Sequence, residues 1–167
     1  MDIVQARVDV INWLTGFVEK TNPLLNGWAP CPYARAARLQ NKIRIDIGLD
    51  PWEDLQQIAQ TGMRDLDVIV VIYDPEEWPL DQFRKQWQLA QSEHLVPNGL
   101  LCLEDHPDDI ETVNGAVMNQ GTWALLLVQQ QSKLDEAARQ LAAKGYYNGW
   151  PEDYLRDVFQ GRQDPRS

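Results

Sequence analysis

The sequence predicts an α/β protein in which helices cover a small, four-stranded sheet that is largely parallel or mixed. Apolar segments typical of strands alternate with segments of helical periodicity, one strand segment is apolar throughout, and no repeat or linker divides the chain. The second choice is a ferredoxin-like α+β fold, which needs a different order of elements. We expect a single domain over residues 1–160 and a frayed tail over 161–167.

The first two predicted helices are separated by a segment rich in turn-forming residues. Apolar residues recur at steps of three and four, which predicts an amphipathic helix over 3–20. Its apolar face would consist of Val4, Val8, Ile11, Leu14 and Val18. A short helix is expected over 32–40, because Pro32 suits the first helical position.

The next three elements form a predicted strand–helix–strand unit. Residues 43–48 alternate between apolar and polar, as in a half-buried strand. Asp50 and Pro51 then indicate the start of a helix that continues to about residue 64. Residues 68–73 are apolar throughout, which is typical of a strand covered on both faces.

The second half of the chain continues the alternation. We expect helices over 78–95, 132–144 and 151–160, and strands over 100–104 and 123–128. The last of these strands could run antiparallel to the one before it. The segment 108–119 is ambiguous, and its apolar spacing allows a short helix.

Composition excludes several classes of function. The net charge is −10 and the basic residues form no stripe, so we expect no nucleic acid to bind. No apolar run reaches the roughly 20 residues of a membrane span, and the first residues do not resemble a signal peptide. The presence of only two cysteines predicts a cytoplasmic protein with reduced thiols. The sequence identifies no cofactor and no specific partner.

Cys31 is the strongest candidate for a reactive residue. At or next to a helix N-cap, its sulfur would face free backbone N–H groups and the positive end of the helix dipole, which favour the thiolate. Arg35 and Arg38 lie within two turns and could bind an anionic substrate, while Trp28 and Tyr33 could line a pocket. The structural alternative is a small apolar residue packed at the helix start.

The predicted topology brings further polar residues to the Cys31 thiol. If the first three strands are parallel and the 32–40 helix runs back along the first of them, Cys31 would meet residues that follow the strands. These are Asp74, after the second strand, and Glu104, Asp105 and His106, at the end of the third. His106 would act as the general base, and Asp74 or Glu104 would orient its ring. His106 could instead form hydrogen bonds only within its turn.

Two motifs resemble those of an uncharacterised bacterial domain family. Pro30-Cys31-Pro32-Tyr33-Ala34 is similar to a Cys-Pro-Phe/Tyr-Ala motif after an N-terminal helix, and His106-Pro107 to a later His-Pro. A further His-Pro of the family is replaced here by Asp74-Pro75. The family carries no known function, so the resemblance supports only Cys31 and His106 as a pair to test.

Three functional hypotheses follow. In the first, the protein is a thiol-dependent enzyme with Cys31 as nucleophile or redox centre. In the second, Cys31, His106, Asp74 and Glu104 bind a metal such as zinc or iron. In the third, the chain is an acidic interaction or regulatory module that binds a partner through its C-terminal aromatic residues. The structural alternative is that these residues only dock the last helix. Those residues are Tyr146, Tyr147, Trp150 and Tyr154.

Overall fold

A four-stranded mixed sheet forms the centre of the protein. The computed structural model describes residues 1–167. The strand order is β1-β2-β6-β3, with β1 at Ile43–Ile47, β2 at Val68–Tyr73, β3 at Leu100–Asp105 and β6 at Ala124–Gln130. β1 and β2 are parallel, and β6 is antiparallel to both of its neighbours, so β3 runs in the same direction as β1 and β2. The predicted α/β fold with a mixed sheet is confirmed.

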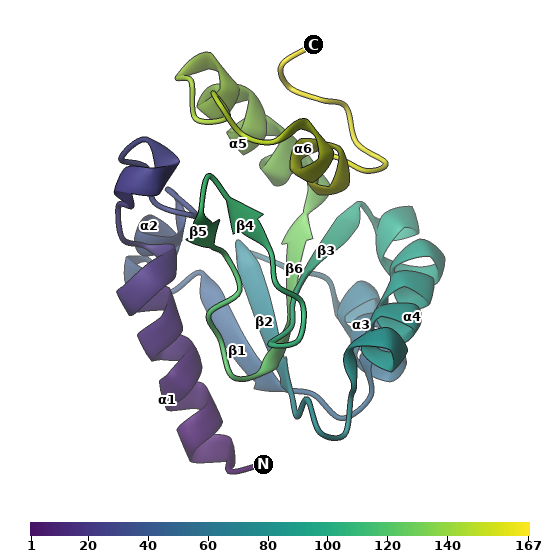
Figure 1. Ribbon diagram of the computed structural model, residues 1–167. Helices are drawn as coiled ribbons and strands as arrows, with labels where there is room; N and C mark the ends of the chain where they lie inside the picture. The colour runs from purple at the N-terminus through teal and green to yellow at the C-terminus, as the bar shows by residue number, and fades with distance from the viewer.

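Helices and a small hairpin cover the two faces of this sheet (Figure 1). On one face lie α1 (Ile3–Trp13) and the hairpin of β4 (Thr112–Val113) and β5 (Ala116–Val117). On the other lie α3 (Pro51–Thr61) and α4 (Leu80–Ala90). α5 (Gln131–Ala143) and α6 (Glu152–Val158) lie beyond the end of β6. The remaining helical segments are η1 (Leu14–Val18), η2 (Pro23–Leu25), α2 (Ala34–Leu39), η3 (Gln91–Leu95) and η4 (Val96–Asn98).

Three apolar clusters hold these layers together. The largest joins the sheet to α3 and α4, the second joins the opposite face to α1, and the third joins the hairpin to α5 and α6. Alternate residues of β2 enter the first two clusters, Ile69 and Val71 on one side and Val70 and Ile72 on the other. The continuous apolar run of β2 therefore reflects burial on both faces.

The apolar face predicted for α1 is only partly the buried one. Ala6, Val10, Leu14 and Val18 pack against the sheet, whereas Val4, Val8 and Ile11 face solvent. The helix therefore has two neighbouring apolar stripes, and only one of them packs on the sheet. Sequence periodicity could not distinguish them, because both repeat every three to four residues.

One local prediction is confirmed and another is wrong: the cap of α3 forms as expected, and the segment 108–119 does not form a helix. Asp50 caps α3 as expected, since its side chain accepts from the N–H groups of Trp52 and Glu53. The ambiguous segment 108–119 forms the β4–β5 hairpin rather than a short helix. Asn114 and Gly115 make its two-residue turn, both at positive φ, as a type I′ turn requires.

The C-terminal tail makes ionic contacts with the rest of the chain. Residues 161–167 form no helix or strand, but Arg162 is bonded to Asp135, and Arg166 to Glu152 and Asp164. The division into a domain over 1–160 and a frayed tail stays a prediction. No helix in the structure combines the length and the apolar character needed to cross a membrane.

Candidate functional site

Cys31 lies in the turn before α2, next to the end of η1. Its N–H donates to the carbonyl oxygen of Val18 at 3.1 Å, and the preceding carbonyl of Pro30 accepts from the hydroxyl of Tyr146 at 2.6 Å. Although the residue as a whole is exposed, its sulfur is desolvated by its neighbours, and this raises the pKa of the thiol. The backbone N–H groups of Tyr33 and Ala34 lower the pKa, as predicted, but do not offset the desolvation.

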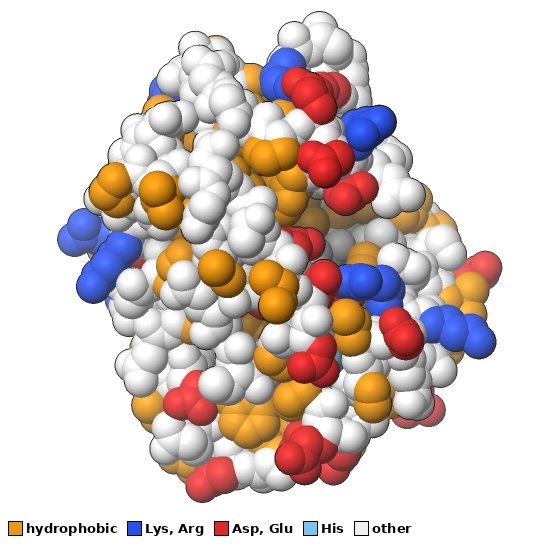
Figure 2. Space-filling model, in the orientation of Figure 1, with side chains coloured by type: hydrophobic (Ala, Val, Ile, Leu, Met, Phe, Trp, Pro, Cys, Tyr) orange, Lys and Arg blue, Asp and Glu red, His pale blue; other side chains and the backbone are white.

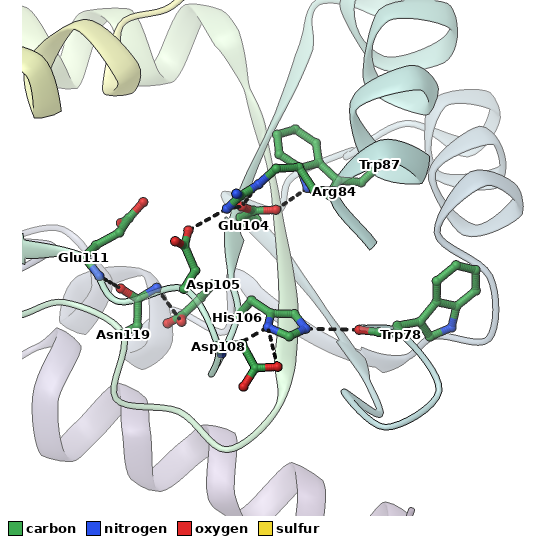
Figure 3. Close-up of polar contacts among 10 residues, drawn as sticks. Trp78, Arg84, Trp87, Glu104, Asp105, His106, Asp108, Glu111 and Asn119 are labelled. Atoms are coloured by element: carbon green, nitrogen blue, oxygen red, sulfur yellow. Dashed lines mark hydrogen bonds and ion pairs between the residues drawn. The ribbon is translucent and has the colours of Figure 1, made fainter. Parts of the chain in front are cut away.

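His106 is a fully buried residue whose two ring nitrogens are both engaged. Nε2 lies 3.0 Å from the carbonyl oxygen of Trp78, and Nδ1 accepts from the N–H of Asp108 at 3.2 Å (Figure 3). Because a backbone N–H can only donate, Nδ1 is unprotonated and the proton lies on Nε2. The ring also packs against Phe83. His106 therefore joins the loop after β3 to the start of α4, with no free nitrogen for a substrate or a thiol.

The structure separates Cys31 from His106 instead of bringing them together. Cys31 lies beside Val18, at one end of the α1–η1 rod, while the amino group of Met1 at the other end lies 3.3 Å from Asp74. The eleven residues of α1 and five of η1 span about 20 Å. His106 lies at the Asp74 end, because Tyr73 and Asp105 pair with the neighbouring residues Ala124 and Leu125.

The short length of α2 explains why the predicted convergence is wrong. The strands β1, β2 and β3 are indeed parallel, but α2 has only six residues and rises by about 9 Å. It ends beside the start of β1, where the N–H of Lys42 donates to Ala37. Such a helix cannot run back to the carboxyl end of β1, so Cys31 stays at the amino end.

The two predicted acidic partners have structural contacts of their own. Asp74 accepts from the N–H of Glu76 and lies against the amino group of Met1. Glu104 forms hydrogen bonds with Arg84 and with the indole N–H of Trp87. The proposed metal set does not assemble, and no group of three or more His, Cys, Asp or Glu side chains in the structure is placed to bind a metal ion.

The residues predicted to bind substrate near Cys31 are mostly engaged with other side chains. Arg38 makes a two-point ion pair with Glu19, and the hydroxyl of Tyr33 lies 3.2 Å from Gln140. Trp28 packs edge-on against Tyr146. Arg35 is exposed to solvent. Three of the four predicted substrate-binding residues therefore have structural contacts of their own.

The C-terminal aromatic residues form a core and not a binding surface. Tyr146, Tyr147 and Trp150 are buried and pack against one another with ring centroids 4.9–5.4 Å apart. Tyr154 extends the cluster from α6. The aromatic interaction surface expected as an alternative is therefore not formed by this cluster, whose role is to dock α5 and α6.

A different site lies between β3, the hairpin and α6. Asp105 is only 6% exposed, and its Oδ1 accepts from the side-chain amide of Asn119 at 3.2 Å. The same amide group accepts, through Oδ1, from the N–H of Glu111 at 2.8 Å. Figure 3 shows Asn119 between the two acids. One side chain thus joins the carboxyl group of Asp105 to the backbone of Glu111, which lies in a different segment of the chain.

Figure 2 shows a hollow over β3 and β6, bordered by the hairpin, α6 and α4, with acidic side chains around it. Side chains alternate along β3, so Leu101 and Leu103 share the face of Asp105. Leu103 is 40% exposed and Leu127 beside it is half-buried. The hollow therefore combines a partly apolar floor with carboxyl groups at one end.

Neither acid is neutralised by a basic side chain. Arg84 is bonded to Glu104 and lies 2.5 Å from Asp109, and its charge lowers the pKa of Glu111, but Asp105 and Glu111 make no ion pair. Burial raises the pKa of Asp105 to about 6, against the hydrogen bond from Asn119. Burial, followed by the negative charges of Asp109, Asp105 and Glu104, raises the pKa of Glu111 to about 7.

Tyr154 completes this group from α6. Burial raises the pKa of its hydroxyl, and the charge of Glu111 raises it further, followed by those of Asp105 and Asp109. The hydroxyl therefore stays protonated as a donor facing the acids. We name Asp105, Glu111, Asn119 and Tyr154 the carboxylate site.

Sequence reasoning missed most of the carboxylate site for an identifiable reason. Asp105 stood among residues expected near the sheet edge, but Glu111, Asn119 and Tyr154 lie in segments whose positions depend on the hairpin. The one available signal was the Asn114-Gly115 turn, which favours a hairpin over the helix expected for 108–119.

No protein-family model, curated protein or solved structure matches the chain. The resemblance of the Cys31 and His106 motifs to a bacterial domain family therefore stays a prediction.

Proposed function

We propose that the protein binds a small organic cation, an amine or amidine attached to an apolar body, in the hollow at the carboxylate site. The observation that carries the proposal is the pair Asp105 and Glu111, two partly desolvated acids that make no ion pair. The side chain of Asn119 joins their segments by bonding the carboxyl group of Asp105 and the backbone N–H of Glu111. A ligand cation would supply the missing charge.

The surroundings of the acids favour an amphipathic ligand over an inorganic ion. The floor exposes Leu103, which suits an alkyl or aryl group, and the phenol of Tyr154 adds a polar contact at the acidic end. The net charge of −10 would raise the local concentration of a cation and speed its approach. No nucleic acid partner is part of this proposal, and a cytoplasmic location stays a prediction.

An acid–base reaction is the second candidate function. Carboxyl groups with pKa values of about 6 and about 7 exchange protons near neutral pH, as general acids and bases do. The reaction would then be carried out on the bound amine or on a group next to it. A thiol-dependent reaction at Cys31 stays a prediction from sequence and has no base beside the sulfur.

Calorimetric titration with matched ligands tests cation binding. Phenethylamine and agmatine should bind, whereas 2-phenylethanol, which has the apolar group without the charge, should not. The variants Asp105→Asn and Glu111→Gln should each weaken amine binding about 10-fold or more, because a charge-assisted hydrogen bond contributes roughly 1.5–3 kcal/mol. Glu136→Gln, an exposed acid on α5, is the matched control and should bind normally.

Equal affinity of wild type and the Asp105→Asn/Glu111→Gln double variant for the amines would overturn the proposal. Equal affinity of the wild type for 2-phenylethanol and phenethylamine would also overturn it. The second candidate is tested separately by incubating the protein with the bound amine ligands and following product formation by mass spectrometry.

A further inference from the structure

The outer edge of β1 has backbone groups without strand partners. The carbonyl of Lys42 and the N–H of Gly48 both bond to β2, so the even-numbered residues between them also face β2. Ile43, Ile45 and Ile47 therefore direct their N–H and C=O groups away from the sheet. Arg7 of α1 covers one of these groups, since its Nη1 donates to the carbonyl of Ile45 at 2.6 Å.

The sequence of β1 is complementary to itself in one antiparallel register. If Ile45 lies opposite Ile45 of a second copy, Ile43 lies opposite Ile47, and every outward-facing N–H and C=O finds a partner. Within one strand Arg44 and Asp46 already form an ion pair, with Nε and Oδ2 2.8 Å apart. In the same register Arg44 also lies opposite Asp46 of the second copy, twice, so the two pairs combine into one network of alternating charges across the strands. A register shifted by two residues would place Arg44 opposite Arg44 or Asp46 opposite Asp46 and would leave two of the isoleucines unpaired.

α1 carries an unpartnered apolar stripe beside this edge. Val4, Val8 and Ile11 are 73%, 44% and 46% exposed and follow the four–three spacing of a helix-pairing seam. Arg7 reaches β1, whereas Asp9, on the other side of the helix, accepts from the indole N–H of Trp123 next to β6. The stripe therefore lies on the β1 side of α1, toward the open edge of the sheet.

We propose that two copies of this chain associate about a two-fold axis at Ile45, pairing β1 with β1 and α1 with α1. An axis perpendicular to the sheet keeps both α1 helices on the same face, where they run antiparallel and cover each other's apolar stripe. The two four-stranded sheets become one continuous sheet. Arg7 must release the carbonyl of Ile45, so it limits pairing of this edge.

The opposite edge of the sheet is less open to such pairing. On β3 the N–H of Cys102 donates to the side chain of Gln91 at 2.7 Å, and η3 and η4 pack beside the strand. The carboxylate site also lies beside β3 and plays no part in the dimer. The association therefore does not depend on the proposed ligand.

Sedimentation equilibrium of the wild type and of charge variants, over a range of protein concentrations, tests the dimer. Circular dichroism checks that each variant is folded. Asp46→Arg and Arg44→Asp each place like charges opposite each other, so each should weaken dimerisation at least 10-fold. The double variant Arg44→Asp/Asp46→Arg restores opposite charges across the strands and should recover dimerisation. Val8→Asp should abolish it.

Amide hydrogen exchange provides a readout that does not depend on any variant. The N–H groups of Ile43, Ile45 and Ile47 should become protected as protein concentration rises. A monomer at 1 mM wild-type protein would overturn the proposal. So would a dimer that survives Asp46→Arg and Val8→Asp, or a folded double charge variant that stays monomeric.

Discussion

Asn119 donates from Nδ2 to Oδ1 of Asp105 at 3.2 Å, and this is the one hydrogen bond that the buried carboxyl group accepts. Because the other end of the same amide holds the N–H of Glu111, Asn119 sets the relative position of the two acids. It is a positioning residue for the carboxylate site, and its removal has a defined electrostatic effect.

Replacing Asn119 with alanine should raise the pKa of Asp105 above its value of about 6. The amide hydrogen bond stabilises the charged carboxylate, so its loss favours the protonated form. The pKa can be followed from the side-chain carbonyl carbon resonance of Asp105 in an NMR titration. Asn98→Ala, which removes an exposed amide bonded to His94, is the control. An unchanged or lower pKa of Asp105 would contradict this role for Asn119.

Glu111→Gln should stabilise the protein above pH 7 and have little effect below pH 4.5. In the wild type the folded pKa of about 7 lies above the ordinary 4.5, so the folded state binds more protons, and stability falls as pH rises between these values. We expect a gain of about 1–2 kcal/mol at pH 8, discounted for the solvent-exposed part of the side chain.

Urea unfolding of the Glu111→Gln variant at pH 4.5 and pH 8 measures this difference. Glu136→Gln is the control, because hydrogen bonds from Arg139 and then Gln140 lower the pKa of Glu136 instead of raising it. It should not stabilise the protein at pH 8. An equal effect of Glu111→Gln at both pH values would rule out a raised pKa at this position.

His106→Ala should destabilise the fold by about 2–4 kcal/mol, because it leaves a cavity and two backbone groups without partners. Those groups are the carbonyl of Trp78 and the N–H of Asp108. Thermal unfolding measures the loss, and His94→Ala, at a half-buried ring whose Nε2 has no partner, should cost less. Equal stability of His106→Ala and wild type would show that this hydrogen-bonded role is wrong.

Alkylation of Cys31 by iodoacetamide should reach half of its maximal rate above pH 9. Desolvation raises the pKa of the thiol above the ordinary 9.0, and no imidazole lies beside the sulfur. His106→Gln should leave the rate profile unchanged. The Cys31→Ser variant accounts for any reaction at Cys102, which is buried. Half-maximal alkylation near pH 7 would restore the hypothesis of an activated thiol.

The elements of the fold were predictable where local patterns and burial agree. β2 and the Asp50 cap of α3 follow directly from an apolar run and from capping chemistry. The antiparallel insertion of β6 between β2 and β3 was open, because strand order depends on contacts between distant segments. The hairpin was missed because its strands have two residues each, too few for any periodicity.

The candidate site was less predictable than the fold. The parallel direction of β1, β2 and β3 is correct, and it does place Asp74 and His106 at one edge. The position of Cys31 depended instead on the length and packing of α2, for which six residues give little sequence signal. Hydrogen bonds to both nitrogens of His106 involve backbone groups, which sequence composition does not reveal.

The position of β6 has a consequence for how the chain acquires its structure. β6 is the last strand in sequence but lies between β2 and β3, and it pairs with both along nearly its whole length. While synthesis has reached only Gln120, β6 is absent, so β2 and β3 lack the strand that lies between them. Folding of the sheet must therefore wait for about three-quarters of synthesis, during which chaperone protection of β2 would prevent aggregation.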